Sequence, residues 1–150
     1  MSLEWLSLND AEQIFELYCD DFADGWSQKM LCESFSLGRF LALGVKENQK
    51  LVGIITCSVG LFDADIESIY VKKEFRKQGI AYMLMTGLED RLVSQNKEKI
   101  FLEVRKSNIS AQNLYAKCGF SKVGERKEYY SDLETAVIMA KELKNKNENC

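Results

Sequence analysis

The segment EFRKQGIAYMLM, residues 74–85, places two basic residues and a glycine directly before an apolar run with helical spacing. It offers no Ser, Thr, Asp or Asn to cap the first turn of that helix. An uncapped start presents about four unpaired backbone N–H groups and the positive end of the helix dipole. Gly79 would let an anion approach these groups, and Arg76 and Lys77 would add positive charge. The segment therefore predicts a diphosphate site, although a solvated basic turn before an amphipathic helix would explain the same residues equally well.

Histidine is absent from the sequence, which removes the usual general base and the commonest metal ligand. A Ser-His or Cys-His hydrolase is therefore excluded. Segment 74–85 also lacks the G-x-x-x-x-G-K-[ST] and G-x-G-x-x-G patterns, so neither a P-loop NTPase nor a Rossmann site is indicated. The five cysteines are irregularly spaced with no C-x-x-C pair, and we expect reduced thiols and no metal.

Acid–base chemistry must then use Glu, Asp, Tyr, Cys or Lys, and two side chains are candidates. Glu103 alternates along the strand-like segment KIFLEVR, where the pattern alone favours an exposed carboxylate paired with Arg105. Tyr115 lies on a helical stripe with Leu114 and Cys118, where a buried core aromatic is as good an interpretation as a functional one.

Composition sets the broad class of the protein. The chain has 150 residues, 46% of them hydrophobic and 29% charged, which is typical of one globular domain. It shows no secretion signal and no apolar run of membrane-spanning length, so we expect a cytoplasmic protein without membrane attachment. The net charge of −3 and pI near 5.2 argue against direct binding of nucleic acid.

The expected elements form one α/β (α+β) domain over residues 1–143, with a single mixed central sheet flanked by helices and a disordered tail at 144–150. Alternating or continuous apolar runs predict strands at residues 3–8, 39–45, 51–60, 65–73, 99–105, 121–130 and 134–143. Helical spacing predicts a helix capped by Asn9 or Asp10, a second from Ser27 to about Phe35, a third from Gly79, and a fourth over residues 110–118. Gly119 would end the fourth in a left-handed conformation.

Two ordered motifs resemble those of the Gcn5-related N-acetyltransferases (GNAT family). R-x-x-G-x-A, with Arg76, Gly79 and Ala81, is similar to that family's acyl-CoA pyrophosphate loop, and NISAQNLYAKCGF from Asn108 is similar to its N-x-x-A-x-x-L-Y-x-x-x-G-F block. The motifs cover residues 65–120, and the element order fits the GNAT fold throughout. Within the family, the segments LEVR, LYAKCGF, ERKEYY and ETAVIMA most resemble the ribosomal-protein-alanine N-acetyltransferases (RimI type). The chain has Gly25-Trp26-Ser27 where that group has Pro-Trp-Ser, and Glu134-Thr135-Ala136 where it has Glu-Asp-Ala.

The resemblance implies an acetyl-CoA-dependent N-acetyltransferase and gives each candidate a role. Glu103 would accept the proton of the incoming amine, and Tyr115 would donate one to the departing CoA thiolate. Asn108 would hydrogen-bond the cofactor as well as cap its helix, and the remaining residues would hold acetyl-CoA through strand backbone and pyrophosphate loop: Ile69, Tyr70, Val71, Arg76, Lys77, Gln78, Gly79, Ile80, Ala81 and Tyr82.

The acceptor is less well defined than the reaction. At pH 7 an α-amine of pKa about 7.7–8.0 is about 10–20% neutral, whereas a lysine amine is only about 0.04% neutral. Glu103 would take the proton during or after attack, or burial would make its carboxylate a stronger base. We expect the N-terminus of a protein as partner, a small-subunit ribosomal protein being one candidate, and a monomer or weak dimer. A lysine or small amine as acceptor, or a non-catalytic acyl-CoA-binding domain, are the alternatives.

Overall fold

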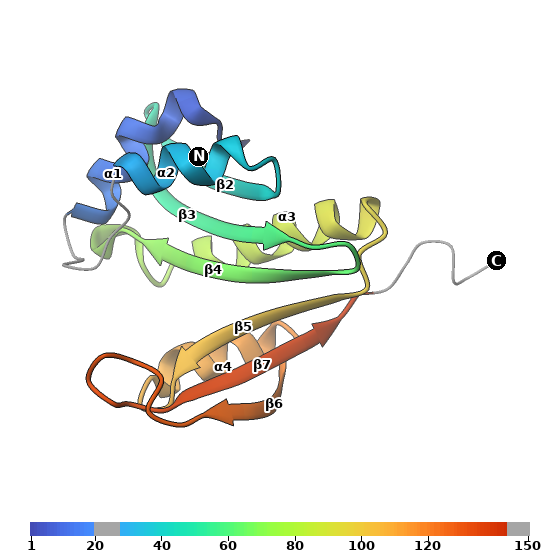
Figure 1. Ribbon diagram of the computed structural model, residues 1–150. Helices are drawn as coiled ribbons and strands as arrows, with labels where there is room; N and C mark the ends of the chain where they lie inside the picture. The colour runs from blue at the N-terminus through green and yellow to red at the C-terminus, as the bar shows by residue number, and fades with distance from the viewer. Residues whose placement is uncertain (20–27, 144–150) are drawn as a thin grey trace.

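The computed structural model describes residues 1–19 and 28–143, which form a seven-stranded sheet flanked by helices (Figure 1). The strand order is β1-β2-β3-β4-β5-β7-β6, in which β4 and β5 are parallel and all other neighbours antiparallel. The strands are β1 (Ser2–Trp5), β2 (Phe40–Glu47), β3 (Lys50–Val59), β4 (Asp63–Val71), β5 (Lys99–Arg105), β6 (Ser121–Arg126) and β7 (Ala136–Glu142). The helices are α1 (Ala11–Cys19), α2 (Gln28–Ser36), α3 (Ile80–Ser94) and α4 (Ile109–Lys117), with short 3₁₀ turns at Leu8–Asp10 and Lys73–Phe75. The predicted single mixed sheet is confirmed.

The helices cover both faces of this sheet. Helices α1 and α2 lie on one face of β2–β4, and α3 and α4 lie on the other side of the sheet (Figure 1). The helices and the sheet form two apolar clusters. In one, Leu17 of α1 and Leu31 of α2 pack with Ile54 of β3. The other contains Leu84 of α3 and Tyr115 of α4. Strand β3 is thus buried on both faces, which explains its almost unbroken run of apolar residues.

The first elements differ from the prediction in their bounds. Strand β1 ends at Trp5, because Ser7 begins a 3₁₀ turn that runs directly into α1. Ser7 accepts a hydrogen bond from Asn9 N, and Asp10 Oδ2 accepts one from Ser7 N at 2.9 Å, which completes a capping box. The prediction that Asn9 or Asp10 is the cap was therefore wrong, since Asp10 is the reciprocal partner in the box.

The last two strands are shorter than predicted, while β5 has the predicted bounds. Residues 127–135 form a connection in which the N–H groups of Tyr129 and Tyr130 both donate to Glu134 O. Leu133 has a φ of +67°, which an extended strand could not contain. The predicted left-handed residue after α4 is confirmed, with Gly119 at φ +97°. The predicted cap at Ser27 and the predicted tail at 144–150 lie outside the described residues.

Strands β4 and β5 separate soon after they begin. Residues 63–65 pair with 99–101, and beyond them the strands diverge (Figure 1). The β3–β4 register shifts at the same place, since Cys57 lies opposite Ile66 but Thr56 lies opposite Ser68. Glu67 is therefore an extra residue in β4, a bulge that bends the strand. The bulge directs the remainder of β4 away from β5.

Lys141 of β7 connects the strand to both helices on this side of the sheet. Its Nζ lies 2.9 Å from Glu89 Oε2 of α3 and donates to Cys118 O at 2.6 Å. Glu89 Oε1 is buried and has no hydrogen-bond partner among the described residues. Lys141 is thus the group that compensates the charge of a carboxylate largely removed from water.

We expect Lys141→Met to lower the free energy of unfolding by about 2 kcal/mol, because it leaves the Glu89 carboxylate and the Cys118 carbonyl unsatisfied. Urea denaturation followed by circular dichroism measures the change. Lys122→Met is the matched control, since Lys122 pairs with Glu125 at 2.9 Å on the exposed surface and should cost less than about 0.5 kcal/mol. Equal losses in the two variants would contradict the assigned role of Lys141.

Candidate active site

A cleft of about 520 Å³ lies between β4, the turn that precedes α3, and α4. It brings together every residue that the sequence predicted for cofactor binding except Gln78. The lining residues from that set are Ile69, Tyr70, Val71, Arg76, Lys77, Gly79, Ile80, Ala81, Tyr82 and Asn108. We call this space the first cleft.

The turn before α3 has the uncapped form that the sequence predicted. Gly79 is the N-cap at φ +79°, and it makes no side-chain capping hydrogen bond. Lys77 is also left-handed, at φ +63°. The first turn of α3 therefore keeps backbone N–H groups without a side-chain acceptor, and such groups at a helix N-terminus favour an anion. A Cβ built on Gly79 would meet no atom within 4 Å, so the surface above it is open.

Arg76 was expected to add positive charge to the turn, and it also forms a hydrogen bond with β4. Its Nε donates to Val71 O at 2.8 Å, and its guanidinium carbon lies 5.5 Å from the centre of the Tyr70 ring. The arginine thus fixes the turn against the strand that forms the opposite wall of the first cleft.

Asn108 begins α4 as predicted. Its Oδ1 accepts a hydrogen bond from Ala111 N at 3.1 Å, which satisfies one donor of the first turn. Its direct bond to a cofactor stays a prediction. Ser110, Ala111 and Leu114 also line the first cleft and were not predicted to do so. The signal was present for two of them, because Ala111 and Leu114 share the helical stripe of Tyr115.

Tyr115 is 7% exposed and packs beside Phe120, so the expectation of a buried aromatic is correct in its geometry. Tyr115 also lines the first cleft. A further space of about 460 Å³, bounded by β4, β5 and Tyr130, is called the second cleft, and Tyr115 lines it too. Burial raises the pKa of Tyr115 to about 12, with smaller contributions from Cys118 and Tyr130. The phenol therefore keeps its proton at neutral pH, and it is a weaker acid than an exposed tyrosine.

Glu103 lines the second cleft together with Ile69, Asn108 and Tyr115. Its side chain is 27% exposed, and its Oε1 lies 3.2 Å from Arg126 Nε. The pairing with Arg105 that the strand pattern favoured was wrong. The connection between β6 and β7 brings other carboxylates to that arginine.

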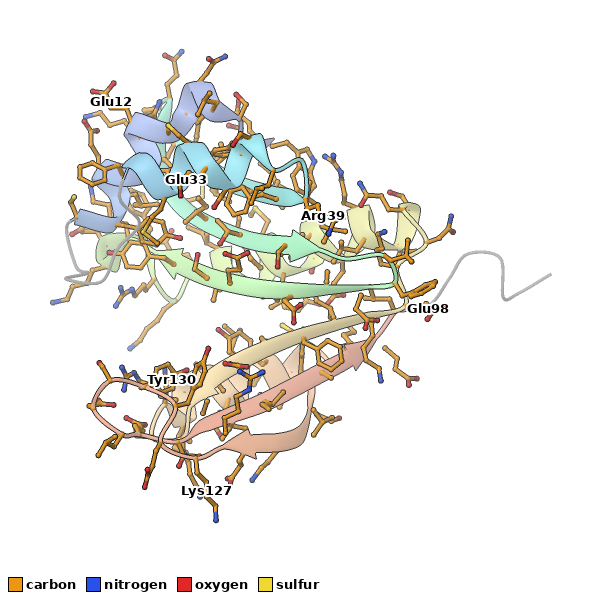
Figure 2. All side chains as sticks on the ribbon, viewed as in Figure 1. Glu12, Glu33, Arg39, Glu98, Lys127 and Tyr130 are labelled. Carbon is orange, nitrogen blue, oxygen red and sulfur yellow. The ribbon has the colours of Figure 1, made fainter. Side chains whose placement is uncertain are left out.

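Arg105 is held by Asp132 at 2.8 Å and by Glu134 at 3.2 Å. Glu134 Oε1 also accepts from Ser107 N at 2.9 Å, and these contacts hold the β6–β7 connection against the end of β5. Tyr130, labelled in Figure 2, lies on this connection and lines the second cleft, with its ring 4.1 Å from the Arg105 guanidinium carbon. The pKa of Tyr130 is raised, mainly because burial disfavours the phenolate.

A third cleft adjoins the second and is rich in carboxylates. Asp65, Glu67, Glu103 and Arg126 all line it. The pKa values of Asp65 and Glu67 are raised, above all because their carboxylates are partly withdrawn from water. Neither residue was predicted for the site, although both alternate along DIESIYV in a way that places them on one face of the strand.

The described residues contain no group of three His, Cys, Asp or Glu side chains arranged to hold a metal ion. Nor does any helix in the described ranges have the length and apolarity needed to cross a membrane.

Comparison with known proteins gives one consistent family. The model of the acetyltransferase (GNAT) family matches residues 11–120. A ribosomal protein bS18-alanine N-acetyltransferase of Haemophilus ducreyi is 31% identical over 142 residues, covering 92% of this chain and 97% of that protein. The crystal structure of the ribosomal-protein-S18-alanine N-acetyltransferase of Escherichia coli is 28% identical, with a TM-score of 0.89 over 99% of this chain and 97% of that one.

A further N-acetyltransferase, from Thermoplasma acidophilum, was solved in complex with coenzyme A and shares the fold. Its TM-score is 0.76 at 21% identity, and the alignment covers 95% of this chain and 99% of that one. The open surface above Gly79 is consistent with a ligand that carries a diphosphate.

We expect Gly79→Asp to weaken the binding of coenzyme A at least about tenfold, or about 1.4 kcal/mol, because it adds a carboxylate where the diphosphate would lie. Isothermal titration calorimetry measures the affinity. Gly38→Asp is the matched control, since Gly38 also has positive φ, at +70°, and open space around its Cβ, but lies between α2 and β2. Unchanged affinity in a folded Gly79→Asp protein would exclude this turn as the binding site.

Proposed function

Because the chain belongs to the acetyltransferase (GNAT) family, we propose that it transfers the acetyl group of acetyl-CoA to the N-terminal α-amine of a protein. The observation that carries this proposal is that Glu103 and Tyr115 line the second cleft, and that Tyr115 also lines the first cleft, which the uncapped turn of α3 bounds. The names of the relatives support the choice of acceptor, since they are ribosomal protein bS18-alanine N-acetyltransferases. The N-terminal alanine of bS18 is therefore the first acceptor to test.

In the proposed reaction the amine nitrogen attacks the thioester carbonyl, so that a C–N bond forms and the C–S bond breaks. Glu103 accepts the proton that the nitrogen loses. Tyr115 donates a proton to the sulfur, so that coenzyme A leaves as a neutral thiol. Residues 69–71 line the first cleft, and a backbone N–H of this strand would stabilise the oxygen of the tetrahedral intermediate.

The environment of each group constrains when its proton moves. Donation from an ordinary phenol to a thiolate is uphill by about 2 kcal/mol, and burial makes Tyr115 a weaker acid still. Its proton must therefore move as charge develops on the sulfur rather than before. For Glu103, the ion pair with Arg126 is partly exposed, so an incoming ammonium group can displace the guanidinium at little cost.

The acidic third cleft supports an acceptor that arrives as a cation. Asp65 and Glu67 lie beside Glu103, and an ammonium group entering here would be attracted by all three carboxylates. The ammonium group must lose one proton to solvent before it attacks, and an α-ammonium does so more readily than a lysine ammonium because its pKa is lower by about 2.5. This difference favours a protein N-terminus over a lysine or a polyamine as the acceptor.

We expect peptides with an N-terminal alanine to be acetylated with the highest kcat/KM, ahead of matched peptides that begin with serine or methionine. Spermidine, and a lysine-containing peptide whose own N-terminus is blocked, should react at least about 10²-fold more slowly, because at neutral pH so little of each is neutral amine. Release of coenzyme A, detected with a thiol reagent, measures the rates. A preference for lysine or spermidine would overturn the proposed acceptor and leave acetyl transfer in place.

Glu103→Gln should lower kcat by about 10²–10⁴-fold through loss of the general base, with the affinity for acetyl-CoA nearly unchanged. Raising the pH should partly restore its rate, because more of the acceptor is then neutral.

Tyr115→Phe removes only the hydroxyl, so the protein should fold while kcat falls by about 10²-fold or more. High pH should not restore this variant.

The wild-type phenol keeps its proton across the assay range, since the pKa of Tyr115 is about 12. Glu142→Gln, at the exposed end of β7, is the control and should leave kcat unchanged. Near wild-type rates in both Glu103→Gln and Tyr115→Phe would contradict the assigned roles.

A further inference from the structure

Three hydroxyl groups meet on the α1 side of the sheet. Ser68 Oγ lies 2.7 Å from Thr56 Oγ1 of β3 and 2.5 Å from Tyr18 OH of α1. Ser68 therefore joins three elements through one oxygen. Thr56 is fully buried. Among the described residues, no other Ser, Thr, Asn, Gln or charged side chain is buried in the core. Its neighbours along β3 are apolar, so a hydroxyl at this position needs a physical reason.

The hydroxyl cluster of Tyr18, Thr56 and Ser68 coincides with the bulge of β4. Thr56 and Ser68 are direct partners in the β3–β4 ladder, and the register shifts immediately beside them. The extra residue, Glu67, directly precedes Ser68. A bulge leaves the local pairing of a strand under-determined, and side-chain hydrogen bonds across it restore a single arrangement. The cluster thus fixes the point at which β4 turns away from β5.

Tyr18 extends this connection along β4. Its ring lies 5.7 Å from that of Tyr70, and Tyr70 in turn lies beneath the guanidinium of Arg76. Residues 69–71, which line the first cleft, are therefore held from both ends, by the hydroxyl cluster at Ser68 and by Arg76 at Val71 O.

We propose that the hydroxyl cluster is a positioning device for acetyl transfer, which holds the backbone of residues 69–71 at the orientation that the thioester requires. The inference rests on the proposed function, and it adds residues that act by holding β4. Two of them, Tyr18 and Ser68, also line the second cleft. Thr56 is the clearest of them, because it lines none of the three clefts. Removal of its hydroxyl takes one hydrogen-bond partner from Ser68 without removing any side chain that lines a cleft.

The test uses Thr56→Val, which keeps the shape of the side chain, and Thr56→Ser, which keeps the hydroxyl. Thr56→Val should lower kcat by at least about tenfold, because a small displacement of a positioning strand is enough to misalign the reacting groups. The dissociation constant of coenzyme A should change much less than kcat, since the turn before α3 is untouched. Thr56→Ser should retain kcat within about twofold of the wild type.

Amide hydrogen exchange of residues 69–71 gives a second readout that needs no acceptor. These amides should exchange faster in Thr56→Val than in the wild type, and at the wild-type rate in Thr56→Ser. Leu92→Ala is the control for general destabilisation, because Leu92 is a fully buried residue in the last turns of α3. It should lower the thermal midpoint and leave kcat and the exchange at residues 69–71 near their wild-type values.

Kinetics are measured with whichever amine the wild-type protein acetylates fastest. An unexpected acceptor then overturns the proposed α-amine without affecting the test of the cluster. The positioning role is contradicted if Thr56→Val keeps kcat within about twofold. It is also contradicted if coenzyme A affinity falls as much as kcat, or if Thr56→Ser is as impaired as Thr56→Val.

Discussion

Strands β4 and β5 form a ladder of only three residue pairs, and the architecture of the site follows from where that ladder stops. Backbone N–H and C=O groups along a strand need partners, and two parallel neighbours in mid-sheet would normally supply them to each other. Here β5 stays bound along its whole length to β7, while the bulge at Glu67 turns β4 aside. A ligand with amide groups can pair with β4 where β5 does not. The interrupted ladder thus creates the cleft and also supplies polar backbone in its wall.

Charge is distributed unevenly along the adjoining clefts. The first cleft ends at the turn of Lys77 and Gly79, where backbone donors and basic side chains gather. The third cleft ends at carboxylates, with Arg126 among them. An anionic ligand and a cationic one would therefore favour opposite ends. Tyr115 lies between them, which suits a reaction that joins one substrate of each kind.

Local sequence signals predicted the parts of this site that depend on local structure. The missing cap and the glycine at position 79 specify a helix start, and Asn108 specifies the next one, because caps involve residues only a few positions apart. The bounds of β5 followed from its alternation. The partners of Glu103 and Arg105 could not be predicted in this way, since they come from β6 and from the connection to β7. The bulge at Glu67 was equally inaccessible, because a register shift is a relation between two strands.

The burial of Tyr115 has a consequence for the complete catalytic cycle. With the proposed roles, transfer to the neutral amine leaves a proton on Glu103 and a phenolate at Tyr115. An acceptor that arrives as an ammonium ion releases one further proton before the attack. A phenolate whose conjugate acid has a pKa of about 12 is a strong base in a poorly hydrated place. Before the next acetyl group can be transferred, a proton must return to it, from Glu103 across the second cleft or from water. The resting state is therefore restored by a separate step, and deuterated solvent would slow that step even where bond formation to carbon is fast.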